Sequence, residues 1–320
     1  MRKHSVARWS GLSLGLAAAA VAALLVPARS SAAPAEAGSA RHDADVARSA
    51  AAAGDDARRP GRGPLVVAHR GASGYAPENT VAAAEAADEV GTTWVETDVQ
   101  RTADGELVLM HDTTLARTTD VEEVFPDRAP WNVADFTAAE IARLDAGSWF
   151  GDEFAGERVP TLEEFARELA DNGQRLLLEL KSPELYPGIE AEILDELADG
   201  GWLRERRPGD RLVLQSFDAE SVRTVHELAP DVETGFLGTP DVDDLAEYAG
   251  FADQINPTYK DLTEEYVAAV HGLRGPHHRP LKVYAWTVDD GPTAVRIADL
   301  GVDGIISNVP DVVARAVARR

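Results

Sequence analysis

Residues 65–100 read LVVAHRGASGYAPENTVAAAEAADEVGTTWVETDVQ, and this stretch decides the fold. A short apolar run, Leu65–Ala68, comes first, an alanine-rich stretch, Thr80–Val90, stops at Gly91, and a second apolar run, Trp94–Gln100, follows. Short apolar runs between turn residues are typical of buried strands, and an alanine-rich stretch with a glycine stop is typical of a helix. The sequence therefore predicts a strand–helix–strand unit whose two strands run parallel.

The same alternation continues to the C-terminus. Helical patterns separate six further apolar runs, which are Leu176–Lys181, Leu212–Ser216, Glu233–Leu237, Asp253–Asn256, Leu281–Thr287 and Asp303–Ser307. Eight strands that alternate with helices are the pattern of a (β/α)8 TIM barrel. We therefore expect an α/β fold of this type over residues 63–320, with an insertion after the second strand at about residues 113–160. The insertion is either a lid over the barrel or a packed decoration.

A hairpin interrupts the alternation directly after the second strand. Asp104-Gly105 suits a two-residue turn, because both residues tolerate the positive φ that such a turn requires. The run Leu107–Met110 would then return antiparallel to the second strand, with His111 directly opposite Asp98. Opposed residues share one face of a sheet, so this register predicts that the carboxylate and the imidazole meet.

The N-terminal residues are not expected to belong to the barrel. Basic residues precede an apolar stretch, Leu12–Val26, and small residues follow it, which is the layout of a secretory signal peptide. We expect residues 1–33 to be such a signal, and residues 34–62, which lack an apolar period, to be a disordered linker. The sequence thus predicts a secreted protein without stable membrane insertion once the signal is removed.

Composition restricts the chemistry and the partners. The chain has no cysteine, which excludes disulfides, a thiol nucleophile and thiolate metal ligands. Its formal net charge of −24 repels nucleic acid and anionic membranes, so we expect a small-molecule partner instead. If that molecule is a phosphate ester, cations in the pocket must overcome the negative field locally, and a metal ion would do so.

Polar side chains gather where the predicted strands end, which is the edge of a barrel that carries active sites. This set comprises His69, Arg70, Glu96, Asp98, His111, Asp112, Glu179, Lys181, Gln215 and Trp286. In contrast, four further histidines fall in helical or loop contexts and are interpreted as surface residues; they are His226, His271, His277 and His278.

The residue types in this set suit phosphodiester chemistry. Three carboxylates fit one hard divalent cation, Ca²⁺ or Mg²⁺, and secretion favours Ca²⁺ slightly, because it is abundant outside cells. Two histidines can supply a general base and a general acid, although the sequence does not say which is which. Arg70 offers a fork for phosphate oxygens and Lys181 a point charge. The attacking oxygen is either water or a hydroxyl of the substrate.

Several motifs resemble those of the glycerophosphodiester phosphodiesterase family in order and spacing. They are VAHRG at 67–71, APENT at 76–80, VETDVQ at 95–100, DG at 104–105, MHD at 110–112, LARTT at 115–119, LELK at 178–181, AWTV at 285–288 and GVDGII at 301–306. The resemblance extends from about residue 65 to the C-terminus. It implies hydrolysis of glycerophosphodiesters to glycerol 3-phosphate and an alcohol, on a barrel with an insertion after the second strand.

The resemblance also implies a role for each matching residue. Metal ligands would be Glu96, Asp98 and Glu179; the acid/base pair would be His69 and His111; the phosphate would bind Arg70 and Lys181; Trp286 would line the alcohol side of the pocket. Glu78 would either support the site from behind or cap the helix that starts near Thr80.

Two positions depart from the family pattern. Asp289 stands where the family usually has Asn, and Ser307-Asn308 stands where it often has Thr-Asp. Neither position belongs to the predicted metal or proton-transfer residues, so we expect these departures to affect substrate contacts only.

Two other functions fit the same scaffold. A lysophospholipase D-type enzyme would need an exposed apolar surface at the mouth, for which Trp149-Phe150 is the sequence hint. A non-catalytic binding protein would be indicated by loss of a metal carboxylate or of a histidine, and all of these residues are present.

Overall fold

The structure is a computed structural model that describes residues 63–204 and 211–319. The predicted signal peptide (1–33) and linker (34–62) lie outside the described residues. Within the described part of the chain, no helix combines the length and the apolar composition needed to cross a membrane.

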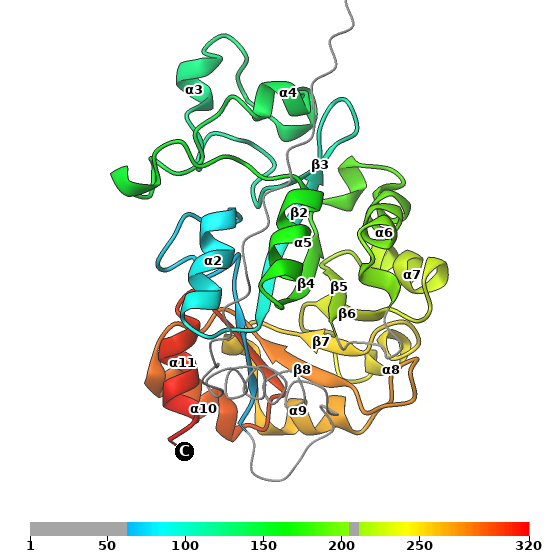
Figure 1. Ribbon diagram of the computed structural model, residues 1–320. Coiled ribbons are helices and arrows are strands. Elements are labelled where there is room, and N and C mark those ends of the chain that lie inside the picture. Colours follow the sequence, from blue (N-terminus) through cyan, green and yellow to red (C-terminus); the bar gives the residue numbers. More distant parts are fainter. Residues whose placement is uncertain (1–62, 205–210, 320) are drawn as a thin grey trace, which may run out of the picture. The chain divides into compact units, whose positions relative to one another are not determined.

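Eight parallel strands close into a barrel, which confirms the predicted fold class (Figure 1). The strands are β1 (Leu65–Ala68), β2 (Trp94–Arg101), β4 (Arg175–Leu180), β5 (Leu212–Ser216), β6 (Glu233–Leu237), β7 (Gln254–Asn256), β8 (Lys282–Ala285) and β9 (Gly304–Ser307). Closure is made by β1, which pairs with β2 on one side and with β9 on the other. The predicted run Leu281–Thr287 is too long, because its last two residues already belong to the loop beyond β8.

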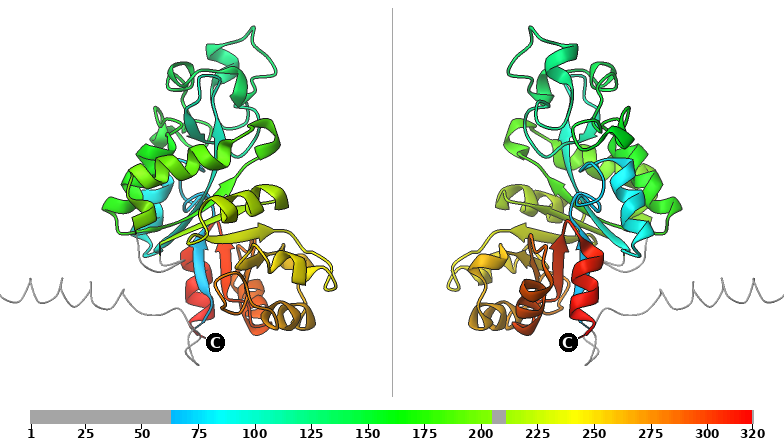
Figure 2. Two further views of the ribbon diagram at one scale, coloured as in Figure 1. Left: turned by 90° about the vertical axis from the view of Figure 1, so that its right-hand side faces the viewer. Right: turned by 90° about the vertical axis from the view of Figure 1, so that its left-hand side faces the viewer.

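Helices lie on the outside of the barrel and follow the strands in sequence (Figures 1 and 2). They are α2 (Val81–Glu89), α5 (Leu162–Asp171), α6 (Ile189–Asp199), α7 (Ala219–Leu228), α8 (Leu245–Tyr248), α9 (Glu264–His271), α10 (Gly291–Asp299) and α11 (Pro310–Val317), with short 3₁₀ segments at Pro183–Leu185, Trp202–Arg204 and Tyr259–Asp261. The sequence signals explain their first turns. Thr161 and Glu164, for example, form a capping box at the start of α5.

Apolar side chains fill the barrel interior toward the amino ends of the strands, and polar groups occupy it toward their carboxyl ends. One buried cluster inside the barrel comprises Val67, Trp94, Leu177, Val213, Tyr284 and Ile306. Successive side chains of a strand point to opposite faces, so Glu96 and Asp98 on β2 follow Trp94 on the interior side. The polar layer is therefore a direct consequence of the period of two in this strand.

The hairpin after β2 forms as expected, but its register differs from the prediction by one residue. The return strand β3 (Leu107–Leu109) pairs Val99 with Leu109, and the amide of Met110 donates to the carbonyl of Asp98. Met110, not His111, is therefore opposite Asp98. The cause is the turn, because the amide of Thr102 donates to the carbonyl of Glu106 and three residues lie between them.

The segment between β3 and α5 is a packed substructure rather than an open loop. It contains α3 (Val121–Val124), α4 (Ala138–Ile141) and 3₁₀ segments at Val133–Asp135 and Asp152–Phe154. Its own buried cluster includes Leu115, Phe136, Ile141 and Leu144. Of the two expectations for the insertion, this core fits a packed element, although Arg117 at its start also reaches the site described below.

Candidate active site

Three carboxylates from two neighbouring strands form the centre of the site. Glu96 and Asp98 come from β2 and Glu179 from β4, where parallel pairing sets Asp98 beside Glu179. One oxygen from each residue lies within 4.8 Å of the others, and all three side chains are buried. The structure thus brings together the three residues that the sequence predicts as metal ligands.

The electrostatics of these carboxylates are those of like charges buried side by side. Burial and the neighbouring Asp98 raise the pKa of Glu96, and burial with Asp98 raises the pKa of Glu179 to about 8. Burial opposes ionisation of Asp98 as well, but Arg70 and Lys181 outweigh it and lower the pKa of this carboxyl. The Oδ1 atom of Asp98 is buried without a hydrogen-bond partner. Carboxylate oxygens in this arrangement could hold a hard divalent cation.

Arg70 and Lys181 lie against the carboxylates from either side of β2, because they follow its two neighbours, β1 and β4. Arg70 Nε is 3.4 Å from Asp98 Oδ2, whereas Lys181 Nζ is 2.7 Å from Glu179 Oε1 and 3.6 Å from Asp98 Oδ1. The backbone turn after β1 aims Arg70: its φ is 56°, and the φ of Gly71 is 78°. A Cβ atom at Gly71 would lie 2.5 Å from Ala83 of α2, so this position requires glycine.

His69 directly follows β1 and is supported by a neutral amide. Its Nδ1 atom is 2.7 Å from Asn308 Oδ1. Burial, followed by the charge of Arg70, lowers the pKa of His69 to about 4. The neutral imidazole therefore dominates at physiological pH, which is the state of a proton acceptor.

His111 directly follows the hairpin and is supported by a carboxylate. Its Nδ1 atom is 2.7 Å from Asp112 Oδ1. Burial lowers the pKa of His111, while Asp98 and the hydrogen bond to Asp112 oppose this change. Asp98 acts electrostatically on both histidines, because its charge also opposes the lowering of the pKa of His69. The predicted opposition of His111 and Asp98 is replaced by this charge effect.

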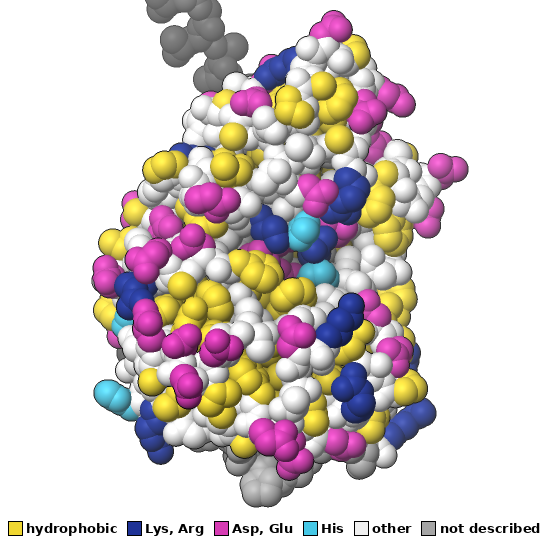
Figure 3. All heavy atoms as spheres, turned by 180° about the vertical axis from the view of Figure 1, so that it is seen from behind, with side chains coloured by type: hydrophobic (Ala, Val, Ile, Leu, Met, Phe, Trp, Pro, Cys, Tyr) yellow, Lys and Arg dark blue, Asp and Glu magenta, His cyan; other side chains and the backbone are white. Residues whose placement is uncertain are grey.

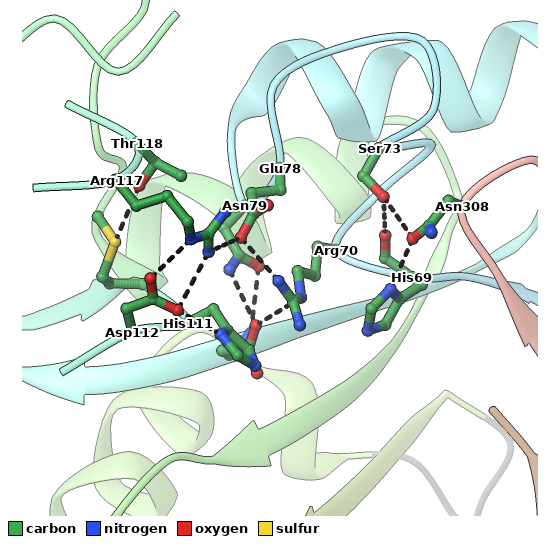
Figure 4. Close-up of polar contacts among 12 residues, drawn as sticks. His69, Arg70, Ser73, Glu78, Asn79, His111, Asp112, Arg117, Thr118 and Asn308 are labelled. Atoms are coloured by element: carbon green, nitrogen blue, oxygen red, sulfur yellow. Dashed lines mark hydrogen bonds and ion pairs between the residues drawn. The ribbon is translucent and has the colours of Figure 1, made fainter. Parts of the chain in front are cut away.

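A chain of ion pairs connects the two sides of the site (Figure 4). Glu78 Oε1 accepts from Arg70 Nη1 at 2.8 Å and from Arg117 Nη2 at 2.7 Å, and Arg117 Nε donates to Asp112 Oδ2 at 2.6 Å. Glu78 does not cap α2, because Thr80 occupies the N-cap. The supporting role expected for Glu78 is thus the one that the contacts favour.

Sequence reasoning assigned no role to several residues that shape the site. Asn79 Nδ2 donates to Asp98 Oδ2 at 2.9 Å, and its Oδ1 accepts from Thr97 Oγ1. Arg117 holds both Glu78 and Asp112. These residues stand inside the motifs APENT and LARTT, so the signal was present, but their contacts depend on the tertiary fold.

The expectation that Asp289 and Asn308 affect substrate contacts only is wrong. Asn308 contacts His69 directly, and Asp289 Oδ2 accepts from Asn308 Nδ2 at 2.7 Å. The two departures from the family pattern are therefore one hydrogen-bonded pair behind a predicted proton-transfer residue. They meet because β8 and β9 are neighbours in the barrel, although the two residues are 19 positions apart in sequence.

Trp286 lies at the rim of the site, partly buried, and its Nε1 donates to the carbonyl of Asn256. Phe217, which directly follows β5, packs edge-on against it with ring centroids 5.6 Å apart. Phe217 is 50% exposed, and Lys181 Nζ is 5.6 Å from the centre of its ring. The two rings form an apolar wall beside the cationic groups.

The four histidines interpreted as surface residues have different environments. Only His278 is exposed; the other three are partly buried. His271 pairs with Asp303 and His277 with Asp253, each at the amino end of a strand and thus at the opposite end of the barrel from the site. The surface interpretation is wrong for these two residues, which are partly buried and paired. The sequence did not indicate this, because their partners lie far away along the chain and only the fold brings them close.

The fold and the site together define an α/β-barrel enzyme whose strand ends carry carboxylates, imidazoles and cationic side chains. A family model described as the glycerophosphoryl diester phosphodiesterase family matches residues 69–312, and the chain belongs to this family. A glycerophosphodiester phosphodiesterase of Caldanaerobacter subterraneus subsp. tengcongensis is 38% identical over 251 residues, which cover 77% of this chain and 95% of that protein. One from Bacillus subtilis (strain 168) is 35% identical, with 77% and 84% covered.

The fold is also similar to solved structures. An Oleispira antarctica phosphodiesterase, solved in complex with its product sn-glycerol-3-phosphate, has a TM-score of 0.66 and 30% identity. The similarity covers 79% of this chain and 96% of that one.

Proposed function

We propose that this protein is a secreted phosphodiesterase that hydrolyses glycerophosphodiesters to glycerol 3-phosphate and an alcohol. One observation carries the proposal: two supported imidazoles, three buried carboxylates and two cationic side chains meet at the carboxyl ends of the strands. Hydrolysis of a phosphodiester requires such groups, because it needs positive charge beside the phosphoryl oxygens, a proton acceptor and a proton donor. The named relatives and the product-bound structure support the same substrate class.

The residues divide the work between binding and proton transfer. Arg70 and Lys181 lie beside the carboxylates and can turn to the phosphoryl oxygens, on which charge builds during the reaction. One imidazole takes a proton from the attacking oxygen as the new O–P bond forms. The other gives a proton to the leaving alcohol as its P–O bond breaks. Exchange with solvent then restores both rings.

Glu96, Asp98 and Glu179 would hold one divalent cation, and Oδ1 of Asp98, which is buried without a hydrogen-bond partner, is the atom that most needs it. When bound, such an ion supplies a Lewis-acid charge for the phosphoryl oxygens. We favour Ca²⁺ over Mg²⁺ because we expect the enzyme outside the cell, where Ca²⁺ is abundant. Titration of the metal-free enzyme with each ion would decide, since equal activation by both would remove this preference.

The decisive assay measures release of glycerol 3-phosphate from glycerophosphocholine. We expect activity that EDTA abolishes and that Ca²⁺ or Mg²⁺ restores. His111→Ala should be inactive, whereas His278→Ala, at an exposed histidine outside the site, should match the wild type. Absence of activity in the metal-restored wild type would overturn the proposed substrate class.

A second candidate is a lysophospholipase D-type activity, and the exposed apolar residues favour it. Tyr75 is 40% exposed after β1, Phe217 is 50% exposed after β5, and Trp149 in the insertion is 42% exposed. On the face shown in Figure 3, hydrophobic atoms adjoin a group of histidine, basic and acidic side chains. Lysophosphatidylcholine turnover that Phe217→Ala reduces much more than glycerophosphocholine turnover would support this activity.

Secretion is proposed from the N-terminal sequence alone. Expression of the full chain in a bacterial host should release a shortened protein into the medium or periplasm. Mass spectrometry of its N-terminus is expected to place the cleavage near Ser30–Ala33. A product that keeps Met1 and stays in the cytoplasm would contradict this proposal.

A further inference from the structure

Asp289 and Asn308 form a compact hydrogen-bonded pair behind His69. Asp289 Oδ1 accepts from the backbone amide of Asn308 at 2.8 Å and from Ser307 Oγ at 3.1 Å. Asp289 Oδ2 accepts from Asn308 Nδ2 at 2.7 Å. Both oxygens of the carboxylate are thereby used, and the side chain of Asn308 is held at two points.

This pair fixes the direction in which the amide of Asn308 faces. A carboxylate accepts hydrogen bonds only, so the NH₂ end of the amide must face Asp289. The Oδ1 end must then face His69, whose Nδ1 atom is 2.7 Å away (Figure 4). Ser73 Oγ lies 2.8 Å from the same oxygen, but its single hydrogen also faces the carbonyl of His69 at 2.7 Å, so Asp289 is the group that sets this orientation.

The amide in turn fixes the proton on His69. Asn308 Oδ1 can only accept, so Nδ1 of His69 must carry the hydrogen. In the neutral ring, Nε2 is then the unprotonated atom. Within the part of the chain that the structure describes, Nδ1 is the ring nitrogen with a hydrogen-bond partner, and Nε2 remains available for a substrate.

The support of His111 differs in one respect. Its Nδ1 atom faces the carboxylate of Asp112, which Arg117 holds in place through two hydrogen bonds. A carboxylate beside Nδ1 stabilises the protonated imidazolium, as in hydrolases in which an aspartate supports a histidine. A neutral amide offers much less of this stabilisation.

We propose that Asp289 and Asn308 are positioning residues that lock His69 in the Nδ1–H tautomer and so make it the proton acceptor, with His111 as the proton donor. The proposal rests on the phosphodiesterase function proposed above. In the forward step, Nε2 of His69 takes the proton of the attacking oxygen while the new O–P bond forms. Nδ1 keeps its proton and its hydrogen bond, and the carboxylate of Asp289 lies one side chain away from the new positive charge.

A reciprocal exchange tests the pair. In Asp289→Asn, the backbone amide of Asn308 still holds Oδ1 of the new side chain, so its NH₂ faces Asn308 and turns the oxygen of that amide away from His69. We expect kcat to fall about tenfold to a hundredfold with KM nearly unchanged. Asn308→Asp sets two carboxylates against each other, and the loss should be greater. The double variant D289N/N308D restores an amide–carboxylate pair with an acceptor still facing Nδ1, so kcat should recover above that of either single variant. The carboxylate now beside Nδ1 also favours the imidazolium, so this recovery should be greatest at high pH.

The control is Asp290→Asn, the same substitution at the next residue. Asp290 caps α10 through Thr293 and contacts no residue of the site. We expect unchanged kcat and a slightly lower melting temperature. Losses in the double variant that equal or exceed the sum of the single losses would overturn the proposal.

A second measurement does not need turnover. In ¹⁵N-labelled protein, two-bond ¹H–¹⁵N spectra of the histidine rings distinguish a protonated from an unprotonated nitrogen. We expect His69 to be Nδ1-protonated in the wild type and in the double variant, and to shift toward the Nε2–H tautomer in Asp289→Asn. An Nε2–H tautomer in the wild type would overturn the proposal even if the enzyme cleaves glycerophosphocholine. Conversely, a wild type without activity but with the expected tautomer would count against the substrate class alone.

Discussion

The two ends of the barrel carry the same kinds of side chain and use them differently. At the carboxyl ends of the strands, three buried carboxylates share two cationic side chains, Arg70 and Lys181, and Asp98 Oδ1 lacks a hydrogen-bond partner. At the amino ends, each buried carboxylate has a cationic or imidazole partner. Glu233 at the start of β6 pairs with Arg279 and Lys282, while Asp253 before β7 pairs with His277.

This difference separates groups that serve chemistry from groups that serve stability. Where buried opposite charges are paired, removal of either partner destabilises the fold. Buried charges of one sign that outnumber their partners lower the stability of the fold, and they are typical of sites where a bound ligand balances the charge. In barrels, the carboxyl ends carry function and the amino ends carry stability. Changes at the two ends should therefore have opposite signatures in activity and unfolding.

The largest expected effect comes from removing either histidine at the active end. His69→Ala and His111→Ala should each lower kcat/KM by about 10²- to 10⁴-fold, with little change in melting temperature. A substrate with a p-nitrophenol leaving group separates the two roles, because this group departs without protonation. It should rescue His111→Ala much more than His69→Ala. The opposite pattern would reverse the assignment of donor and acceptor.

The matching change at the other end is Glu233→Gln. The side chain of Glu233 is 1% exposed, and its loss leaves Arg279 and Lys282 without their carboxylate. We expect the free energy of unfolding in urea to fall by about 2–3 kcal/mol, with kcat unchanged. Glu192→Gln is the control, because Glu192 pairs with Arg101 at the exposed surface and should cost about 0.5 kcal/mol or less. A lower kcat in Glu233→Gln would contradict the division of labour.

Metal removal should reveal the unsatisfied charges at the active end. The pKa of Glu179 is raised to about 8 in the metal-free fold, so its contribution to stability is present below the ordinary carboxyl pKa and is lost as pH rises toward 8. The gain in melting temperature on adding Ca²⁺ should consequently be several degrees greater at about pH 8 than at about pH 5. Differential scanning fluorimetry would measure it. In Glu179→Gln this pH dependence should largely disappear, and a gain that does not vary with pH would contradict the explanation.

The smallest effect is expected for His277 at the amino end. Its hydrogen bond to Asp253 raises the pKa of the imidazole, so the stabilisation is full below about pH 6.5 and fades as pH rises through the raised pKa. His277→Asn should cost about 1 kcal/mol at low pH and less at about pH 9. His278→Asn, at the exposed neighbour, should cost nothing measurable. A penalty that grows with pH would have the wrong sign.

Most of the fold could be predicted from local signals. All eight barrel strands begin and end within two residues of the predicted runs, because apolar composition and turn residues set their limits. The hairpin register was wrong because Asp104-Gly105 also suits a three-residue loop, and this choice depends on Thr102 pairing with Glu106. The sequence contains the turn residues but does not choose between these two pairings.

The site divides in the same way. The period of two in β2 sets Glu96 and Asp98 on one face, and the motifs identify both histidines, so the sequence by itself determined the groups that meet. Only the tertiary structure decided what supports them. Asn308 reaches His69 across 239 residues, and Arg117 reaches Glu78 from the insertion. The physical reason is that a hydrogen bond acts over about 3 Å, so a partner is chosen by which strand ends the closed barrel brings together, and no local pattern records that distance.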